Sequence, residues 1–414
     1  MRLLIVADDL SGAADCAIAF VRAGQRTIVA LRPSAPDTGA GSTTLSIDAD
    51  TRRLDGVQAA QRTLAFYQAQ RRPGQRLYKK IDSTLRGNWP AEVAALRPLA
   101  GMAIVAPAYP ALGRTVSGGN VYVDGVALAE TALWQLEHAH RPAGIAAQLQ
   151  EAGLASETLA EDALADDAHA LSAHIEACAA RGLDAVIVDA SSAQALRTLA
   201  FATAHSQAPF FWVGSGGLAR EIAALQASHR AHAAPPLQRP PGPTLVLVGS
   251  LSAVSDRQCA VLRDRGAVRE VVVPPSVLRQ GPPHAPWQAL HARIGELLAG
   301  GSDVLLRIGR EPAVDASQGP VLAAALAALV GPHFAGIGAL VATGGETARA
   351  MLVEAGIDSL ELVAELQPGV AAGVPCLAGA HRPTIVTKAG GFGDEQALYD
   401  AWFRLQPPSP GHLA

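Results

Sequence analysis

Residues 2–12 read RLLIVADDLSG, and this stretch decides the fold. Its five apolar residues end in the pair Asp8-Asp9, and Ser11-Gly12 then open a segment that predicts a helix to about Ala23. The apolar run is too short for a signal peptide and has the length of a buried strand. A short strand that leads directly into a helix is the first half of a βαβ unit, so the N-terminus predicts a parallel sheet.

The same alternation of strand and helix continues along the chain. In the first half, runs with strand composition precede helical segments: TIVAL, TTLSID, QRLYKKI, MAIVAP, AVIVDA and FFWVG. A proline-rich stretch follows, and beyond it the pattern restarts with TLVLVGS, REVVVP, DVLLRIG, ALVATGG and TIVTKAG. Because closely spaced prolines support neither a helix nor a central strand, this stretch is interpreted as a linker. The prediction is two α/β domains with largely parallel sheets, residues 1–228 and 244–414, joined by a linker at 229–243.

Composition excludes several functional classes. The net charge of −4 and the lack of a long Lys/Arg run argue against a nucleic-acid partner. No apolar run approaches membrane-spanning length without interruption, so we expect no membrane partner. The four cysteines are far apart and form no CxxC pair, which indicates neither a disulfide framework nor a metal cluster and favours a cytoplasmic location.

Acidic residues stand directly after two strands of the first domain. Ligands of open parallel sheets bind beyond the carboxyl ends of the strands, where Asp8, Asp9 and Asp82 fall. Either Asp8 or Asp9 can cap the following helix, and the other aspartate is then expected to point toward a ligand. An aspartyl phosphatase needs Asp-x-Asp at such a position, and Leu10 in the third place excludes that class.

The segment YKKIDSTLRGN, residues 78–88, adds basic and hydroxyl groups at the same edge. Lys79 and Lys80 alternate faces along a strand, so only one of them can face a ligand. We expect one lysine and Arg86 to hold a carboxylate, Arg86 through its bidentate fork. Asp82 and Ser83 are expected to accept hydrogen bonds from, and donate them to, sugar hydroxyls.

Glycine-rich turns take the corresponding positions in the second domain. VATGGETARAML predicts a strand, a glycine turn and a helix start, with Thr343 and Thr347 bracketing amides able to bind phosphate. In TKAGGFGD, Lys388 enters a second glycine turn and is expected to neutralise a phosphate or leaving group. The Walker pattern GxxxxGK[ST] is absent, so an ATP site would be built from these turns. GSGGLA, residues 214–219, matches GxGxxA, but no acidic residue follows on a second strand, which argues against a nicotinamide oxidoreductase.

Seven segments occur in the order found in four-carbon acid sugar kinases, and the chain resembles that family over essentially its whole length. They are ADDLSGAAD, YKKIDSTLRGN, APAYPALGRTVSGGNVYVDG, VGSGGLA, LVGSLS, VATGGETA and TKAGGFG. The resemblance implies an acid-sugar-binding N-terminal domain and an ATP-binding C-terminal domain, with the active site in the cleft between them. It also implies transfer of phosphate from ATP, with Mg²⁺, to the 4-hydroxyl of a sugar acid.

The motifs and the resemblance together assign residues to three groups. Those expected to be catalytic are Asp9 and Asp82, with the choice of base between them open. Those expected to bind the sugar acid are Asp8, Lys80, Ser83, Thr84, Arg86 and, as a weaker addition, Arg114. Those expected to bind ATP are Ser250, Gly344, Gly345, Glu346, Thr347, Lys388 and Gly390. No protein ligand to a metal is assigned.

The form KKIDSTLRGN is closer to the threonate and erythronate branches of the family than to the 3-oxo-tetronate branch. The expected substrate is therefore threonate or erythronate, used in the catabolism of carbohydrate acids. The alternatives are a 3-oxo-tetronate 4-kinase and a non-catalytic sugar-acid-binding protein. The sequence gives no stereochemistry for the substrate and leaves a homodimer open.

Overall fold

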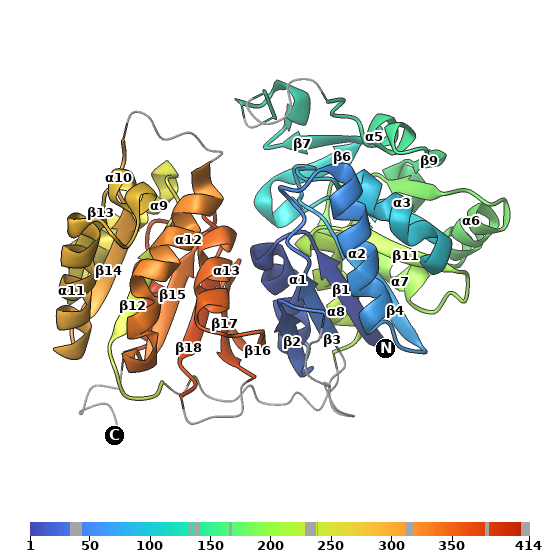
Figure 1. Ribbon diagram of the computed structural model, residues 1–414. Coiled ribbons are helices and arrows are strands. Elements are labelled where there is room, and N and C mark those ends of the chain that lie inside the picture. The colour runs from blue at the N-terminus through green and yellow to red at the C-terminus, as the bar shows by residue number, and fades with distance from the viewer. Residues whose placement is uncertain are drawn as a thin grey trace. The chain divides into compact units, whose positions relative to one another are not determined.

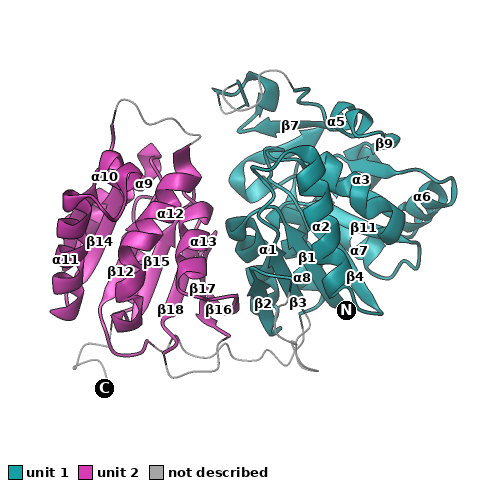
Figure 2. Cartoon of the chain, viewed as in Figure 1, with its two compact units in different colours: residues 1–232 teal, residues 233–414 magenta. Residues whose placement is uncertain are grey.

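A computed structural model describes residues 1–33, 44–132, 134–135, 141–164, 168–227, 237, 239–311, 318–376 and 381–406. The chain forms two compact units, residues 1–232 and 233–414 (Figure 2). Most of the expected linker, residues 229–236 and 238, lies outside the described residues, and the second unit's first strand begins at Thr244.

The first unit is built on a parallel sheet with the strand order β2-β3-β1-β4-β11-β5-β10-β9 (Figure 1). The strands are β1 Arg2–Ala7, β2 Thr27–Ala30, β3 Thr44–Asp48, β4 Gln75–Lys80, β5 Met102–Ala106, β9 Ser156–Leu159, β10 Ala185–Val188 and β11 Phe210–Gly214. The helices are α1 Leu10–Arg22, α2 Gly56–Gln70, α3 Trp89–Ala100, α5 Ile145–Glu151, α6 Ala168–Ala180, α7 Ala193–Ala204 and α8 Gly216–Leu225. Every strand expected in this half is present, and β9 is an additional edge strand.

Helices cover both faces of this sheet. The crossovers through α1 and α7 run in one direction along the strand order, and those through α2 and α3 run in the other. Right-handed crossovers of opposite direction lie on opposite faces, which agrees with the packing of α1 and α7 on α8 and of α2 on α3. Both faces of the central strands are therefore buried, and β1 reads as an unbroken apolar run for that reason.

A small antiparallel sheet of β6 Arg114–Ser117, β7 Asn120–Val123 and β8 Val126–Ala127 extends the first unit. Its first hairpin turns at Gly118 and Gly119, which have φ of 57° and 70°, as two-residue hairpins require. The Asp189 carboxylate accepts hydrogen bonds from both glycine amides, at 2.6 and 2.9 Å. The loop after β10 thereby holds the hairpin to the main sheet.

The second unit has a mixed sheet with the order β13-β14-β12-β15-β18-β17-β16 (Figure 1). The strands are β12 Thr244–Val248, β13 Val268–Val273, β14 Asp303–Ile308, β15 Ala339–Thr343, β16 Ser359–Gln367, β17 Val370–Pro375 and β18 Thr384–Lys388. The helices are α9 Ala253–Arg265, α10 Pro275–Gln280, α11 Ala285–Ala299, α12 Gly319–Val330, α13 Gly345–Glu354 and α14 Ala397–Arg404. The five strands expected here are present and parallel. The antiparallel pair β16 and β17 was not expected.

One helical segment, Gly319–Gly336, is long and apolar enough to cross a membrane by length and composition alone, which the sequence analysis did not anticipate. It consists of α12 and a 3-10 turn, and 39% of it is buried inside the unit. Leu322, Leu326 and Leu329 form its buried side, and α12 packs against α13 and α10. These contacts pack one side of the segment against the rest of the unit.

Candidate functional site

In the first unit the strand order reverses between β1 and β4, and doubly wound sheets bind ligands at such a point. From β1 the chain moves to β2 and β3 on one side, whereas from β4 it moves to β5 on the other. The loops that follow β1, β3 and β4 therefore meet at one edge of the sheet. They carry Asp8, Asp9, Arg52 and Asp82, which we call the carboxylate cluster.

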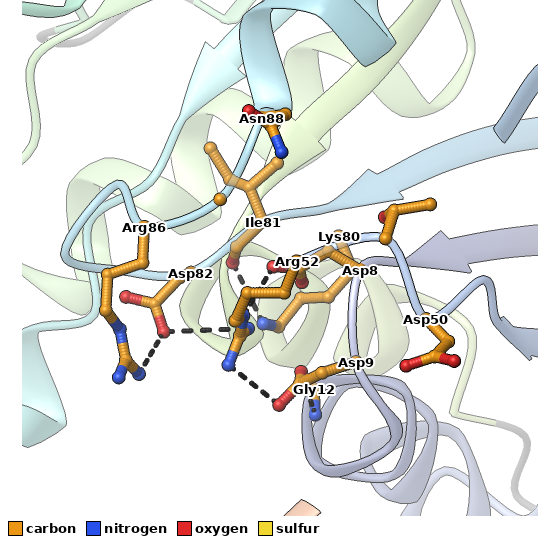
Figure 3. A network of polar contacts seen from close by, with 12 residues as sticks. Asp8, Asp9, Gly12, Asp50, Arg52, Lys80, Ile81, Asp82, Arg86 and Asn88 are labelled. Carbon is orange, nitrogen blue, oxygen red and sulfur yellow. Dashed lines mark hydrogen bonds and ion pairs between the residues drawn. The ribbon is translucent and has the colours of Figure 1, made fainter. Parts of the chain in front are cut away.

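Arg52 binds all three aspartates of this cluster (Figure 3). Its Nε lies 2.7 Å from Asp8 Oδ2, its Nη1 lies 2.8 Å from Asp9 Oδ2, and its Nη2 lies 3.7 Å from Asp82 Oδ2. The side chains of Asp9 and Asp82 are 21% and 13% exposed, whereas that of Asp8 is only 2% exposed. A ligand can thus reach Asp9 and Asp82 more easily than Asp8.

The local backbone explains how the cluster assembles. Asp9 is the N-cap of α1, and its Oδ1 accepts a hydrogen bond of 2.9 Å from Gly12 N. The carbonyl of Asp8 accepts hydrogen bonds from the amides of Thr51 and Arg52, at 3.0 and 3.2 Å, which fixes the loop after β3 beside β1. One aspartate of the pair therefore caps the helix, as the sequence predicts, and its second oxygen still reaches Arg52.

The surrounding charges keep Asp8 and Asp82 ionised. Burial by itself raises the pKa of Asp8, but the Arg52 guanidinium and the ammonium groups of Lys79 and Lys80 outweigh it and lower that pKa. Burial opposes ionisation of Asp82 as well, and the charges of Arg86 and Arg52 hold its pKa well below the usual range. At neutral pH Asp8 and Asp82 are therefore anionic, and the more exposed Asp82 is an acceptor suited to hydroxyl groups.

The loop after β4 turns its side chains toward Asp82. Asp82 Oδ1 accepts hydrogen bonds from the Thr84 amide, at 2.8 Å, and from the Thr84 hydroxyl, while Oδ2 accepts from Arg86 Nη2 at 2.7 Å. Gly87 has φ of 84°, and a Cβ there would lie 3.2 Å from Asp8 Oδ2. The Ser83 hydroxyl makes no hydrogen bond to any described residue. Of the expected ligands in this loop, Ser83 is available, whereas Thr84 and Arg86 are engaged with Asp82.

The two adjacent lysines of β4 lie on opposite faces, as the strand period predicts. Lys79 Nζ is 3.0 Å from Glu92 Oε2, and both side chains are fully buried. Lys80 Nζ donates to the carbonyl of Ile81 at 2.9 Å. It also lies beside the start of α1, as shown by the distance of 2.9 Å between Nζ and a Cβ built on Gly12. Lys79 is thus a core ion-pair residue, and Lys80 is the lysine at the cluster (Figure 3).

Arg114, the weaker expectation, lies apart from the cluster. It begins β6, and its Nη1 donates to the carbonyl of Leu112. In the described part of the chain it makes no hydrogen bond or ion pair with an aspartate of the cluster. The structure therefore does not bring Arg114 together with the other expected sugar-acid ligands.

The second unit repeats the topological reversal, between β12 and β15. The loops after β12, β15 and β18 meet there, and they are packed tightly. A Cβ on Gly249 would lie 1.9 Å from Thr347 Oγ1, and one on Gly390 would lie 2.7 Å from Ser250 Oγ. The structure thus gathers Ser250, Thr347 and Gly390, three of the expected ATP ligands, into one group that we call the phosphate turns, with Gly249 and Gly344.

The phosphate turns end at the N-terminus of α13. Gly344 has φ of 95°, a conformation that favours glycine, and its amide donates to the carbonyl of Lys388 at 2.8 Å. Gly345 and Glu346 form the first turn of α13, followed by Thr347, which is 3% exposed. Amides at the start of a helix carry partial positive charge and bind anions, so this end of α13 suits a phosphate group.

Lys388 has a different place from the one expected. Its side chain is 1% exposed, and Nζ donates to the carbonyls of Ala389, Gly390 and Phe392 at 2.9, 3.3 and 2.9 Å. Burial lowers the pKa of Lys388 to about 8. All three donors of the Lys388 ammonium thus already have acceptors in its own loop. Lys388 therefore stabilises the glycine turn from inside and does not present its charge to a phosphate.

One group of described residues, Glu157, His174 and Cys178, offers three potential metal-ligand atoms within 4.8 Å of one another. Arg181 Nη2 lies 2.7 Å from Glu157 Oε2 and 3.1 Å from Cys178 Sγ. A guanidinium thus already balances the charge of this group. The group lies on β9 and α6, away from the loops that form the carboxylate cluster.

The GxGxxA match has a packing explanation. Cβ atoms on Gly216 and Gly217 would lie 2.3 Å from Asp15 Oδ2 and from the Ala108 carbonyl, respectively. The Ser215 hydroxyl caps α8 at Gly217 N. These glycines allow α8 to approach its neighbours closely, which accounts for the motif without a dinucleotide.

Sequence reasoning missed Arg52. The run TTLSID was correctly predicted to be a strand, but the residues after it were not considered as candidates, although the rule that selected Asp8 and Asp82 applies equally to them. Arg52 is the fourth residue after β3. The signal was therefore present in its position, and its role depends on β3 pairing with β1.

Comparisons with known proteins agree with the division of the chain into two units. A family model for a sugar-binding N-terminal domain matches residues 3–222, and one for a nucleotide-binding C-terminal domain matches residues 245–398. A D-threonate kinase from Cupriavidus necator is 48% identical over 406 residues, 97% of each chain. A D-threonate kinase from Bordetella bronchiseptica is 34% identical over 96% of each chain. A 3-oxo-tetronate kinase from Methylobacterium radiotolerans is 32% identical over 95% of this chain and 96% of its own.

Two solved structures share the fold. One is a protein from Salmonella typhimurium LT2, with a TM-score of 0.79 and 23% identity, covering 98% of this chain and 100% of the other. The second, from Haemophilus influenzae, has a TM-score of 0.73 and 21% identity, covering 97% and 100%.

A sugar-binding domain followed by a nucleotide-binding domain, in a chain 48% identical to a D-threonate kinase over 97% of its length, defines a kinase that acts on a sugar-type small molecule. The chain belongs to the four-carbon acid sugar kinase family, as the sequence segments implied. It is accordingly an ATP-dependent sugar acid kinase.

Proposed function

We propose that the protein is a D-threonate kinase that transfers the γ-phosphate of ATP to the 4-hydroxyl of D-threonate. The observation that carries this proposal is the 48% identity with a D-threonate kinase over nearly the full length of both chains. Two further relatives with that activity in their names match at 34% and 28% identity. The second candidate is phosphorylation of 3-oxo-tetronate, since relatives of that name match at 26% to 32%.

The carboxylate cluster supports binding of the substrate's hydroxyl groups. Asp9 and Asp82 are its two more exposed aspartates, whereas the nearly buried Asp8 holds Arg52 in place. We assign the substrate carboxylate to Lys80 and Arg86. Lys80 Nζ makes one hydrogen bond among the described residues. Arg86 pairs with Asp82 through Nη2 but is 32% exposed, so both side chains can donate to a ligand oxygen.

Phosphoryl transfer through a loose transition state needs orientation and charge neutralisation more than a strong base. The depressed pKa of Asp82 suits a carboxylate that orients the 4-hydroxyl by accepting its hydrogen bond. Between Asp9 and Asp82 we favour Asp82 for this role, because Asp9 also caps α1. Thr84 and Arg86 fix both Asp82 oxygens in advance of substrate binding.

The phosphate turns support binding of the ATP phosphates. We assign Ser250, Gly345 and Thr347 to these phosphates, through hydroxyls and the first amides of α13. Mg²⁺ enters with ATP as part of the substrate and neutralises charge on the phosphate oxygens. The hydroxyl oxygens of Ser250 and Thr347 are of the ligand type that Mg²⁺ binds.

A substrate panel tests the proposal. The protein is incubated with ATP, Mg²⁺ and, in separate reactions, D-threonate, D-erythronate, L-threonate and 3-oxo-tetronate, and ADP formation is followed. The highest kcat/KM is expected with D-threonate. A higher value with 3-oxo-tetronate would favour the second candidate, and no ADP with any acid, despite measurable binding, would favour a non-catalytic binding protein.

A further inference from the structure

A carboxylate that the proposed reaction does not use, that of Glu92, is fully buried in the core of the first unit. Its Oε2 lies 3.0 Å from Lys79 Nζ. Its Oε1 accepts hydrogen bonds from the hydroxyl of Thr51 and, at 3.0 Å, from that of Thr63. All four side chains are fully buried, so Glu92 depends on these partners in place of water. Glu92 thereby joins three other segments: the loop after β3, α2 and β4.

Glu92 and two of its partners are close in the chain to residues of the carboxylate cluster. Thr51 directly precedes Arg52, and the amides of both donate to one backbone carbonyl after β1. Lys79 lies on β4, shortly before Asp82. Glu92 itself is in the first turn of α3, where the loop that begins at Asp82 ends. The loops that carry Arg52 and Asp82 are therefore both attached to this one carboxylate.

The direct contact between these two loops is long and partly exposed. Arg52 Nη2 lies 3.7 Å from Asp82 Oδ2, and the two side chains are 23% and 13% exposed. The hydrogen bond from Thr51 to Glu92 connects the same loops in the fully buried core. Hydrogen bonds in the interior are electrostatically stronger than those open to water. The buried connection is therefore the better suited of the two to hold the loops in register.

Stability alone explains this buried group poorly. Burial of an ion pair removes both charges from water, and replacement of such a pair by apolar side chains is often neutral or stabilising. The pair of Lys79 and Glu92 is therefore better explained by the arrangement that it imposes than by the free energy that it adds. The segments that it arranges are those of the carboxylate cluster.

We propose that Glu92 is a positioning residue of the kinase, which holds Thr51, and with it Arg52, at a fixed place relative to Asp82. The proposal rests on the proposed function, because it takes the carboxylate cluster as the sugar-acid site. Glu92 does not touch the substrate and acts through Arg52. Thr63 contacts the same Glu92 oxygen, but it belongs to α2, which carries no residue of the cluster.

A matched pair of variants tests this proposal. Thr51→Val and Thr63→Val each remove one hydroxyl from Glu92 Oε1 at a fully buried position and keep the shape of the side chain. Urea unfolding should therefore show similar losses of stability in the two variants. Thr51→Val is expected to lower kcat/KM for D-threonate about tenfold, whereas Thr63→Val should stay within about twofold of the wild type. Thr51→Ser, which keeps the hydroxyl, should restore kcat/KM, and ADP affinity by calorimetry should be unchanged in all three variants.

Equal values of kcat/KM in Thr51→Val and Thr63→Val would overturn the proposal, because a purely structural carboxylate is affected alike by the loss of either donor. Glu92→Asp covers the case in which Thr51→Val does not fold. It keeps the charge opposite Lys79 but withdraws the carboxylate by one methylene. Glu92→Asp is expected to lower kcat/KM severalfold, and an unchanged value would also overturn the proposal.

Failure of the proposed function is visible in the wild type alone. If the wild type prefers another acid of the substrate panel, the variants are compared with that acid. If it binds an acid without turnover, calorimetry gives the same comparison as a ratio of Kd values. In each case weaker values for Thr51→Val than for Thr63→Val support the role of Glu92, and equal values contradict it.

Discussion

The carboxylate cluster and the phosphate turns occupy the same topological position in their two units, yet their chemistry is opposite. At the reversal between β1 and β4, charged side chains converge and Arg52 ties three aspartates together. At the reversal between β12 and β15, glycines and hydroxyls pack closely together, and α13 begins there at Gly345. In each unit the carboxyl edge of the sheet provides the location. In our proposal, the residues after each strand decide whether that edge binds a hydroxylated acid or a phosphate.

The lysines at the two edges sharpen this contrast. Lys80 and Lys388 each end a strand at the reversal, and both are nearly buried. Lys80 donates to one carbonyl and lies beside the aspartates, whereas Lys388 donates to three carbonyls of its own loop. The same residue type therefore contributes charge to one edge and backbone shape to the other.

The largest effect is expected from removal of Asp82. Asp82→Ala should lower kcat with D-threonate about 1,000-fold, because the hydroxyl loses its orienting acceptor and Arg86 loses its partner. ADP affinity, measured by calorimetry, should be unchanged because the phosphate turns are in the other unit. A loss of ADP affinity in this variant would contradict the division of roles between the two edges.

The next largest effect is expected at Arg52. Arg52→Ala leaves three aspartates without their shared cation, so kcat/KM for D-threonate should fall about 100-fold. Arg52→Lys should recover little of the loss, since an ammonium cannot reproduce the three-way contact of the guanidinium. Arg53→Ala, at the exposed neighbouring arginine, is the control and should retain activity. Comparable losses at Arg52 and Arg53 would show that the cluster has no special role.

A smaller effect is expected from a methyl group in the phosphate turns. Gly390→Ala would place a Cβ 2.7 Å from Ser250 Oγ, so the turn must shift, and ADP affinity should fall about tenfold. Gly391→Ala, one residue further, meets open space and should bind ADP normally. D-threonate affinity should be unaffected in both variants. Equal ADP affinity for the two variants would argue against the tight packing at Ser250.

The smallest effect concerns pH. The pKa of Lys388 is lowered to about 8, so its ammonium loses a proton, and with it a donor to the loop carbonyls, as the pH rises through 8. Because the glycine turn keeps its shape through these hydrogen bonds, ADP affinity should decline severalfold from pH 7.5 to 9.5. Lys388→Met should remove this dependence. D-threonate affinity should stay level over the same range, since the pKa of Asp82 is far below it. A D-threonate affinity that falls with pH while ADP affinity stays level would contradict the roles given to Lys388 and Asp82.

Lys388 also affects stability with a definite sign. Its folded pKa lies below the value of about 10.4 for an unperturbed lysine, so the unfolded chain binds more protons between those pH values. The contribution of Lys388 to the free energy of unfolding therefore rises with pH from about 8. Comparing urea unfolding of the wild type and Lys388→Met at pH 7.5 and 9.5 isolates this term.

Much of the fold could be predicted because buried parallel strands are continuous apolar runs. All the apolar runs predicted to be strands are strands in the structure. The rule that ligand residues follow the strands correctly predicted that Asp8, Asp9 and Asp82 lie at one edge of the sheet. The pair β16 and β17 was missed, although SLELVAELQ partly alternates and is followed by Pro368-Gly369, a turn signal.

The rest depended on three-dimensional information that a single sequence does not contain. The role of Arg52 follows from β3 lying next to β1, a pairing that apolar runs do not specify. The inward direction of Lys388 follows from how its loop folds back. Nothing in TKAGGFGD distinguishes a lysine that stabilises its own loop from one that binds phosphate. Thr84 illustrates the same limit, because its hydroxyl is engaged by Asp82 two residues away.

The central claim is tested most directly by phosphorus NMR of the reaction products. The protein is incubated with ATP, Mg²⁺ and D-threonate, and the spectrum is compared with that of a reaction without the acid. The account predicts equal amounts of ADP and a new phosphomonoester coupled to the C4 protons of threonate. Unchanged ATP, or ADP accompanied only by inorganic phosphate, would contradict it.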